Sequence, residues 1–257
     1  MSLKERLASA VIGTPLQGPL EWVRRLAQLP HRVRHPELRE IYLEDSRIAE
    51  VIKRVVTPAM NCVDVGCHLG SLLNRILWLS PTGRHTAVEP IPYKAAWLRR
   101  KYPSVTVHEL ALGGEDGEVE FFVDTRRSGF SGLRVHGSGQ NLLRLTVTRR
   151  RLDDLIPAEV NVGFLKVDVE GGEYDVFRGA VRLLSKQRPV VLYECTRSGL
   201  DAFGFVAKQV FEQLNSHHYH TFLFKDYLTG GMPLDLAGFE QSQQYPFQAF
   251  NYLAVPS

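Results

Sequence analysis

The spacing of hydrophobic residues along the chain changes character near residue 60. Before that point, apolar residues recur every three or four positions, which predicts helices. We expect these helices over Leu3–Ile12, Pro19–Leu29 and Glu37–Val56. After that point, short apolar runs alternate with helical stretches, which predicts strands separated by helices. The pattern therefore indicates a helical N-terminal appendage over residues 1–60 and a second domain over residues 61–257.

Strands and helices alternate through most of the second region. Strands are predicted over Cys62–Val65, Arg84–Glu89, Val105–Leu110, Val119–Val123, Leu145–Thr148, Val162–Val169, Val190–Glu194, Tyr219–Phe224 and Phe250–Val255. Helices are predicted up to Leu79 and over Pro92–Lys101, Gly172–Leu184 and Ala202–Leu214. Such alternation predicts an α/β fold with a mostly parallel, doubly wound sheet. A long polar loop with no helix joins the last two strands, so we expect the last strand to be antiparallel.

Composition supports an ordinary globular protein. The chain has 257 residues, of which 44% are hydrophobic and 23% charged, and this length is enough to bury one large core. Disorder and a small disulfide scaffold are excluded. The three cysteines form no CxxC pair, and the N-terminus is a poor signal peptide, which predicts a cytoplasmic protein. No apolar run approaches the 18 residues typical of a membrane span.

The charge balance is informative mainly near the N-terminus. A formal net charge of +3 is too small to imply nucleic acid, although arginine is in excess over lysine. Trp22 lies beside Arg24 and Arg25 in the second predicted helix. These helices are expected to contact a membrane surface peripherally, to cover an active site, or simply to pack on the main domain.

Two motifs follow the first two predicted strands. Asp64, Gly66 and Gly70 form a D-x-G-x-x-x-G turn between the first strand and its helix. Glu89 ends the second strand, where a carboxylate can accept hydrogen bonds from both ribose hydroxyls. Together they favour a nucleoside-binding site over a plain strand–helix turn. The turn lacks the G-x-G-x-x-G of dinucleotide-binding proteins, which disfavours an NAD-dependent oxidoreductase.

A charged cluster marks the end of the predicted strand Val162–Val169. Alternation with period two places Lys166, Asp168 and Glu170 on one side. Charges are costly in a strand buried on both faces, so their presence at its carboxyl end indicates a site in the cleft. Glu173 has an alternative role as an acid in the first turn of the following helix, and Glu170 has one as a helix cap.

Together these segments resemble the FkbM-type methyltransferases over roughly residues 60–195. The segments that carry the resemblance are Asp64–Gly70, Val88–Pro90, Ala111–Gly113, Arg151–Leu155, Lys166–Glu173, Arg178–Ala180, Arg188–Glu194 and the terminal Phe250–Ala254. The resemblance implies a Rossmann-like class I methyltransferase that uses S-adenosyl-L-methionine. It further implies O-methylation of a hydroxyl on a small or glycosylated natural product, such as a sugar, glycolipid or polyketide. Two alternatives remain: an RNA methyltransferase, which the excess of arginine would suit, and a non-catalytic cofactor-binding module of the same fold.

The resemblance also implies roles for individual residues in cofactor binding. Glu89 would hold the ribose. The methionine side of the cofactor pocket would be shaped by Asp64, Gly66 and Gly70, and the adenine would lie near Ala111 and Leu112. The sequence departs from the family at Cys67-His68, where Ala-Asn is common, so His68 is expected beside the cofactor without an assigned role.

An alcohol is a poor nucleophile, so methyl transfer to it benefits from a base within hydrogen-bond reach. Asp168 is the first candidate, Glu170 the second and His68 the third. A divalent cation bound by Asp168 and Glu170 is an alternative way to activate the hydroxyl. The Gly-containing loop Arg126–Gly132 is expected either to close over the acceptor or to be an exposed hairpin tip, and the loop Asp226–Pro246 is a further candidate to line the acceptor site.

Overall fold

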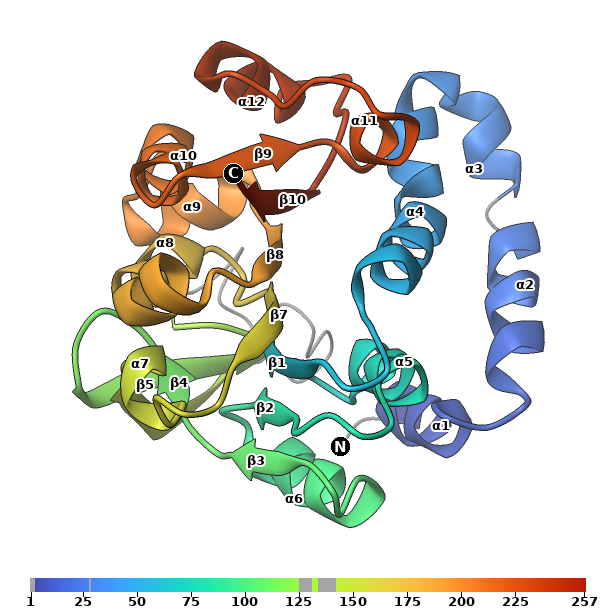
Figure 1. Ribbon diagram of the computed structural model, residues 1–257. Helices are drawn as coiled ribbons and strands as arrows, with labels where there is room; N and C mark the ends of the chain where they lie inside the picture. Colours follow the sequence, from blue (N-terminus) through green and yellow to red (C-terminus); the bar gives the residue numbers. More distant parts are fainter. Residues whose placement is uncertain (1–2, 28, 125–130, 134–141) are drawn as a thin grey trace.

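A computed structural model describes residues 3–27, 29–124, 131–133 and 142–257 of the chain. Figure 1 shows a central sheet with helices on both faces and a separate group of helices at the N-terminus.

Among the described residues, seven strands form the main sheet in the order β3-β2-β1-β7-β8-β10-β9. Their bounds are β1 Asn61–Val65, β2 Thr86–Val88, β3 Thr106–His108, β7 Val162–Val167, β8 Val190–Glu194, β9 Tyr219–Phe222 and β10 Asn251–Pro256. Strands β3, β2, β1, β7 and β8 are parallel to one another. Strand β10 is antiparallel to both of its neighbours. The expected doubly wound sheet with an antiparallel last strand is confirmed.

The strand order reverses direction between β1 and β7. From β1 the chain moves outward to β2 and β3, and it later returns to β7 on the other side of β1. In open parallel sheets, ligands bind beyond the carboxyl ends of the strands at such a switch point. The first and third sequence motifs both follow strands that meet at this point.

Helices cover both faces of the sheet because β1 and β7 bury apolar side chains in both directions. Val63 and Leu165 pack toward the face that carries α8 and α10, while Cys62 and Phe164 pack toward α4 and α5. The bounds of the helices after β1 are α5 Ser71–Leu79, α6 Pro92–Lys101, α7 Leu152–Leu155, α8 Glu173–Arg178, η3 Leu183–Gln187, α9 Arg197–Phe203, α10 Ala207–Ser216, α11 Phe224–Thr229 and α12 Leu236–Ser242.

A second, three-stranded sheet lies beside the carboxyl end of the first. It has the order β4-β6-β5, with bounds β4 Ala111–Leu112, β5 Gly117–Asp124 and β6 Leu142–Arg150. Strands β5 and β6, which contain the strands predicted over Val119–Val123 and Leu145–Thr148, pair antiparallel over residues 117–124 and 142–149. The two-residue strand β4 runs parallel to β6 and was not predicted.

The structure corrects three sequence predictions. The helix predicted over Gly172–Leu184 is interrupted: α8 ends at Arg178, and Gly179 follows it. At this break Gly179 lies against the carbonyl oxygen of Gly113, where a β-carbon would be only 2.2 Å away, so only glycine fits. The helix predicted over Ala202–Leu214 is two helices, since Gly204 has a left-handed backbone that ends α9. The predicted polar loop between the last strands contains α11 and α12, each of which buries a phenylalanine in the core.

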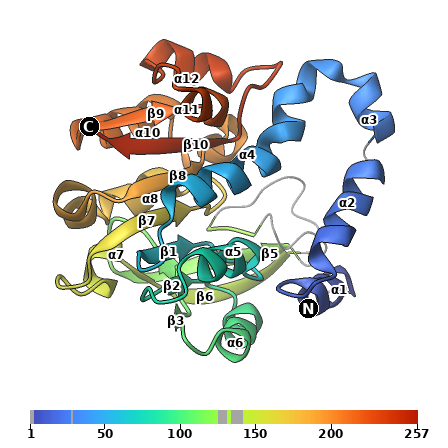
Figure 2. The ribbon, with the colours of Figure 1, turned by 45° about the vertical axis from the view of Figure 1, so that its right-hand side comes forward.

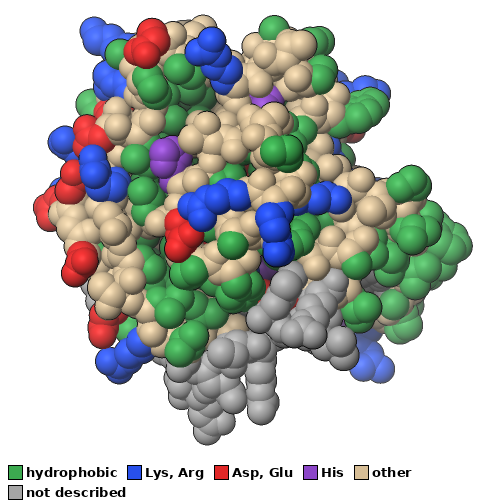
Figure 3. Space-filling view, turned by 90° about the horizontal axis from the view of Figure 1, so that it is seen from below, with side chains coloured by type: hydrophobic (Ala, Val, Ile, Leu, Met, Phe, Trp, Pro, Cys, Tyr) green, Lys and Arg blue, Asp and Glu red, His purple; other side chains and the backbone are tan. Residues whose placement is uncertain are grey.

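The N-terminal helices are α1 Leu3–Val11, α2 Gln17–Ala27, α3 Leu29–Arg34, η1 Pro36–Leu38 and α4 Arg39–Val55. Helix α4 is anchored in the core through Val51 and Ile52. Helices α2 and α3 stand apart from the sheet in both ribbon views (Figures 1 and 2). Figure 3 shows hydrophobic side chains gathered at its right-hand edge, on the side where Figure 1 places α1 and α2. Among the helices described, none has the length and apolar character needed to cross a membrane.

Candidate active site

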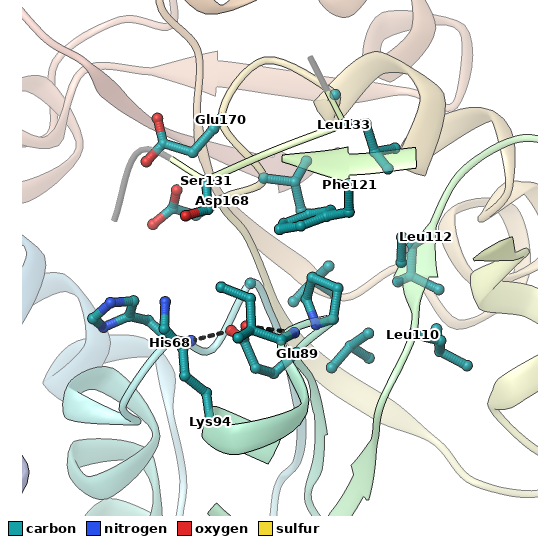
Figure 4. A pocket seen from close by; sticks show the side chains of 18 of the residues that line it. His68, Glu89, Lys94, Leu110, Leu112, Phe121, Ser131, Leu133, Asp168 and Glu170 are labelled. Atoms are coloured by element: carbon teal, nitrogen blue, oxygen red, sulfur yellow. Dashed lines mark hydrogen bonds between the residues drawn. The ribbon is translucent and has the colours of Figure 1, made fainter. Parts of the chain in front are cut away.

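A cavity of about 300 Å³ opens at the carboxyl ends of β1, β2 and β7. It lies at the switch point of the sheet, and the small sheet closes one side of it. Figure 4 shows the side chains that line it. Seven of the predicted site residues are among them: Gly66, His68, Glu89, Ala111, Leu112, Asp168 and Glu170.

The turn after β1 lies directly against the turn after β7. Gly66 has φ +71°, and a β-carbon there would lie 1.7 Å from the carbonyl oxygen of Asp168. Because no other residue fits this approach, glycine brings the two turns together. His68 and Glu170 also have left-handed backbones, with φ of 54° and 59°. Such conformations are uncommon for residues other than glycine and cluster at functional sites.

Glu89 is held in place by backbone N–H groups. Its Oε2 accepts a hydrogen bond from the His68 N–H at 2.8 Å, and its Oε1 accepts one from the Ile91 N–H at 3.0 Å (Figure 4). Burial raises the pKa of Glu89, and the nearby ammonium of Lys94 opposes this rise. Each carboxylate oxygen has a second lone pair. Glu89 can therefore accept further hydrogen bonds from a ligand without losing its own anchors.

The end of the cavity away from His68 is apolar. Figure 4 shows Leu110 and Leu112 on one wall, with Phe121 and Leu133 above them. Phe121 is supplied by β5 of the small sheet and is buried. An aromatic ring between aliphatic side chains forms a slot that suits a flat, weakly polar ligand group.

Lys166 links the ends of β1 and β7. Its Nζ donates hydrogen bonds to the carbonyl oxygens of Gly66 at 2.8 Å and Val65 at 3.2 Å. The same ammonium lies 3.3 Å from Asp64 Oδ1 and 3.3 Å from Asp168 Oδ2. One buried cation therefore neutralises two carboxylates and fixes the turn that contains Gly66. The sequence motif identified Lys166 as charged but gave it no task.

Three carboxyl groups meet at the edge of the cavity. Oxygens of Asp168, Glu170 and Glu194 all lie within 4.8 Å of one another. Burial raises the pKa of Glu170 to about 8, and the negative charge of Asp168 adds to this rise. Burial and Asp168 also raise the pKa of Glu194 well above its ordinary value. At neutral pH both glutamates are therefore protonated.

Asp168 has the opposite protonation state. Burial alone would raise its pKa, but the Lys166 ammonium and a hydrogen bond from Glu194 outweigh burial and hold the pKa of Asp168 below its ordinary value. A protonated Glu194 thus donates to an ionised Asp168. Burial lowers the pKa of His68 to about 4, with Lys94 contributing, so its imidazole is neutral at pH 7. Asp168 is therefore the ionised carboxylate of this cluster.

Strand β7 ends at Val167, so strand alternation does not position Glu170 as predicted. The left-handed backbone of Glu170 turns its side chain toward Asp168 instead. Glu170 is also not a helix cap, because Gly172 occupies the N-cap position of α8. Glu173 accepts hydrogen bonds from the N–H groups of Val169 and Gly171, which gives it the structural role expected as an alternative.

Asp64 and Gly70 are absent from the residues that line this cavity. Asp64 is buried beneath the turn, 3.3 Å from the Lys166 ammonium that also contacts Asp168. A β-carbon on Gly70 would lie 2.9 Å from both Leu98 and Tyr102, so this glycine lets α5 pack closely against α6. Their predicted influence on a cofactor would therefore be indirect.

A second cavity, of about 960 Å³, lies between the N-terminal helices and the strand ends. It shares Gly66, His68 and Asp168 with the first cavity. Its other wall comes from α2, α3 and α4 and includes His31, Tyr42, Glu44, Asp45 and Ala49. Two cavities therefore meet at the ionised carboxylate, one enclosed by the sheet and one covered by the N-terminal helices.

Sequence reasoning missed Glu194 and Phe121. The sequence predicts Glu194 at the end of the strand Val190–Glu194. Because parallel strands end at the same edge of a sheet, this position could have indicated that Glu194 lies near Asp168. Phe121 belongs to another sheet, and no sequence spacing indicates its approach to the cavity. Of the loop Arg126–Gly132, residues 126–130 lie outside the described residues. Ser131 lines the first cavity.

The strand order, the turn at Gly66 and the acid after β2 are the features that the sequence motifs predicted together. A family model for the methyltransferase FkbM domain matches residues 64–224, more than half of the chain. The chain belongs to the FkbM methyltransferase family. This confirms the resemblance, and with the strand order it gives the Rossmann-like class I methyltransferase fold. A search among curated proteins gave no match.

Solved structures with similar folds include the methyltransferase FkbM from Methylobacillus flagellatus KT, at 18% identity and TM-score 0.47 over 77% of this chain and 44% of that one. An S-adenosylmethionine-dependent O-methyltransferase from Thermotoga maritima is similar at 12% identity and TM-score 0.43, over 82% and 63% of the two chains. Geranyl diphosphate C-methyltransferase from Streptomyces coelicolor A3(2) is similar at 14% identity and TM-score 0.42, over 82% and 79%. The chain spans less than half the length of the first of these proteins.

Proposed function

We propose that this FkbM methyltransferase transfers a methyl group from S-adenosyl-L-methionine to a hydroxyl oxygen of a small or glycosylated natural product, such as a sugar, glycolipid or polyketide. The observation that carries the proposal is the shared wall of the two cavities. Asp168, the ionised carboxylate, lines both of them. A methyl donor in one cavity and a hydroxyl in the other would meet beside a base.

The first cavity fits the proposed cofactor. The spare lone pairs of Glu89 suit ribose hydroxyls, and the slot formed by Leu110, Leu112 and Phe121 suits adenine. Gly66 lines this cavity at the end of β1, where the methionine moiety would lie. Bound there, S-adenosylmethionine would supply an electrophilic methyl group on a sulfonium.

Asp168 would accept the proton of the attacking hydroxyl. A carboxylate with a lowered pKa is always ionised at neutral pH but is a weak base, so its larger contribution is to orient the hydroxyl. Lys166 keeps Asp168 ionised and Glu194 fixes its position. Glu170 is protonated at pH 7 and serves poorly as a base, and His68, whose pKa is lowered to about 4, is also a weak base.

Asp168, Glu170 and Glu194 also present the oxygen ligands that Mg²⁺ prefers. We propose instead that no cation binds here and that protonated Glu194 donates a hydrogen bond to Asp168, because the Lys166 ammonium already neutralises Asp168. The expected result is full activity after treatment with EDTA. Loss of activity that added Mg²⁺ restores would instead assign the cluster to a cation.

The acceptor is proposed to occupy the second cavity, with the helices of residues 1–60 as its cover. The cavity wall is rich in polar side chains, among them His31, Tyr42, Asp45 and Arg75. Such a wall can donate to and accept from several hydroxyl groups at once.

The deciding experiment measures transfer of a labelled methyl group from S-adenosylmethionine to a panel of sugars, glycolipids and polyketides, with NMR of the product to locate an O-methyl group. Asp168→Asn should lower kcat by about 10²–10⁴-fold and leave the affinity for S-adenosylhomocysteine, measured by calorimetry, unchanged. Full activity in that variant would remove Asp168 from the mechanism. Methylation of RNA alone would identify the other enzyme class, and cofactor binding without turnover on any acceptor would indicate a non-catalytic module.

A further inference from the structure

The helices α1, α2 and α3, here termed the N-terminal arm, expose an unusual share of the molecule's apolar surface. Among the described residues, fourteen large hydrophobic side chains are exposed, and eight of them fall within residues 7–33. They are Leu7, Leu16, Leu20, Trp22, Val23, Leu26, Leu29 and Val33. Because this segment is about a tenth of the chain, the exposure is concentrated in the arm and is not the ordinary scatter of surface residues.

Helix α2 is amphipathic, yet its apolar side is not covered. At 100° per residue, Leu20, Val23, Leu26 and Trp22 fall on one continuous side of the helix. In a surface helix of a globular protein, such a stripe packs on the core. Here all four side chains are exposed, with Trp22 at 62% and Val23 at 55%. The apolar side of α2 therefore needs a partner outside the described part of the chain.

The charge of the arm indicates the kind of partner. Residues 3–34, which include all three helices of the arm, contain five arginines, one lysine and two glutamates, a net charge of +4. The whole chain carries +3, so the remainder of the protein has a net charge of −1. A helix that combines exposed Trp and Leu with basic residues has the properties of segments that lie in the interface of an anionic bilayer.

The arm is also attached in a way that suits this role. Tyr93 of α6 donates a hydrogen bond to Glu5 of α1 at 2.8 Å, which ties the start of the arm to the sheet domain. At its other end, the His31 ring of α3 bonds the Tyr42 hydroxyl of α4 at 2.7 Å. Between these anchors, Gln17 and Ala27 line the second cavity. A surface docked on the arm would thus lie next to that cavity.

We propose that the N-terminal arm docks this methyltransferase on anionic lipid bilayers. The apolar residues of α2 and α3 enter the interface between headgroups and acyl chains, and the arginines pair with lipid phosphates. The docking does not depend on which acceptor is methylated. It would place the second cavity within reach of an acceptor dissolved in the same bilayer.

The test is co-sedimentation of the full chain with phosphatidylcholine vesicles that contain phosphatidylglycerol, and with vesicles of phosphatidylcholine alone. We expect strong binding to the first and weak binding to the second, with the difference reduced by salt. The double variant Trp22→Ser with Leu26→Ser should bind at least about tenfold more weakly, since two apolar side chains no longer enter the interface. Arg34→Gln should weaken binding by about fivefold.

Matched controls lie elsewhere on the surface. Trp78→Ser on α5 removes a tryptophan that is even more exposed than Trp22, and Arg100→Gln on α6 removes an exposed arginine. Both should bind like the unaltered chain. Calorimetry with S-adenosylhomocysteine should give the same affinity for every variant, because none of these residues lines the first cavity.

Three results would overturn the proposal: no binding to anionic vesicles at low salt, equal binding by the double variant, or equal loss in the Trp78→Ser control. Sedimentation equilibrium covers a further outcome. If the chain dimerises, and Trp22→Ser with Leu26→Ser abolishes the dimer but does not change vesicle binding, the arm is an interface between two copies and the membrane role is wrong.

Discussion

A single buried ammonium organises the charges of the site. Lys166 contacts the carboxylates of Asp64 and Asp168 and the carbonyl oxygens at the end of β1. Removing one member of a buried ion cluster lowers the free energy of unfolding by more than the intact cluster adds to it, because the remaining charges are left buried without a partner. Lys166 is therefore a positioning residue, and we expect its replacement to lower the stability of the whole fold.

We expect Lys166→Met to destabilise the protein at pH 7 by about 3–5 kcal/mol, measured by urea unfolding. The loss should shrink toward pH 4, where Asp64 and Asp168 of the variant can take up protons. Lys208→Met is the matched control, since Lys208 forms an exposed pair with Glu212 and should change stability by less than about 0.5 kcal/mol. Equal effects of the two substitutions would contradict the role given to Lys166.

Glu170 makes stability depend on pH. Its pKa is raised from 4.5 to about 8 in the folded state by burial and by Asp168. Between these values the folded state holds a proton that the unfolded state has lost, so stability falls as pH rises through this range. Glu170→Gln removes the effect.

The variant should therefore match the unaltered chain near pH 4 and exceed it at pH 8, by about 2–4 °C in Tm for each kcal/mol gained. Thermal unfolding followed by circular dichroism from pH 4 to 8 measures this. Glu115→Gln, at an exposed acid, should leave the pH profile unchanged. Parallel curves for Glu170→Gln and the unaltered chain would show that Glu170 is ionised in the folded state.

At the scale of elements, the Arg151–Leu155 motif connects two segments of the chain through hydrogen bonds. The Asp153 carboxylate of the Arg151–Leu155 motif accepts hydrogen bonds from the N–H groups of Arg182 at 2.6 Å and Leu183 at 2.9 Å. These groups open the turn η3, and they would otherwise lack partners. The motif thus joins α7 to the chain segment that leads into β8.

Asp153→Ala should lower the free energy of unfolding by about 1–2 kcal/mol, the usual cost of losing such a cap. Asp154→Ala, one position later, breaks only a surface pair with Arg151 and should be nearly neutral. Urea unfolding of the two variants compares them directly. If the two variants lose the same free energy of unfolding, Asp153 does not cap the start of η3.

At the scale of the molecule, the two cavities should be separable by mutation. Ala49 lines the second cavity from α4 and is absent from the lining of the first. Ala49→Trp should raise the KM for the acceptor by about tenfold, equivalent to 1.4 kcal/mol, because the added ring occupies space proposed for the acceptor.

The affinity for S-adenosylhomocysteine should not change in Ala49→Trp. Ala96→Trp, at an exposed position of α6, is the control and should alter neither quantity. If Ala49→Trp weakened cofactor binding and left the KM intact, the assignments of the two cavities would have to be exchanged.

The sequence by itself determined where the strands of the main sheet lie along the chain, that this sheet is mostly parallel, and that Glu89 and Asp168 follow their strands. These follow from local periodicity and from the rule that parallel strands present their carboxyl ends at one edge. Helix breaks at Gly179 and Gly204 were less predictable, since a glycine ends a helix only where the backbone of another segment or a left-handed turn requires it.

Only the tertiary structure decided which residues share the site. Glu194 and Phe121 join Asp168 and Glu89 through contacts between distant segments, and the second cavity exists only because α2, α3 and α4 lie opposite the strand ends. The protonation states of the carboxyl groups in the site could not be predicted from the sequence either. Burial, a neighbouring ammonium and a shared proton set them, and all three are properties of distances in space.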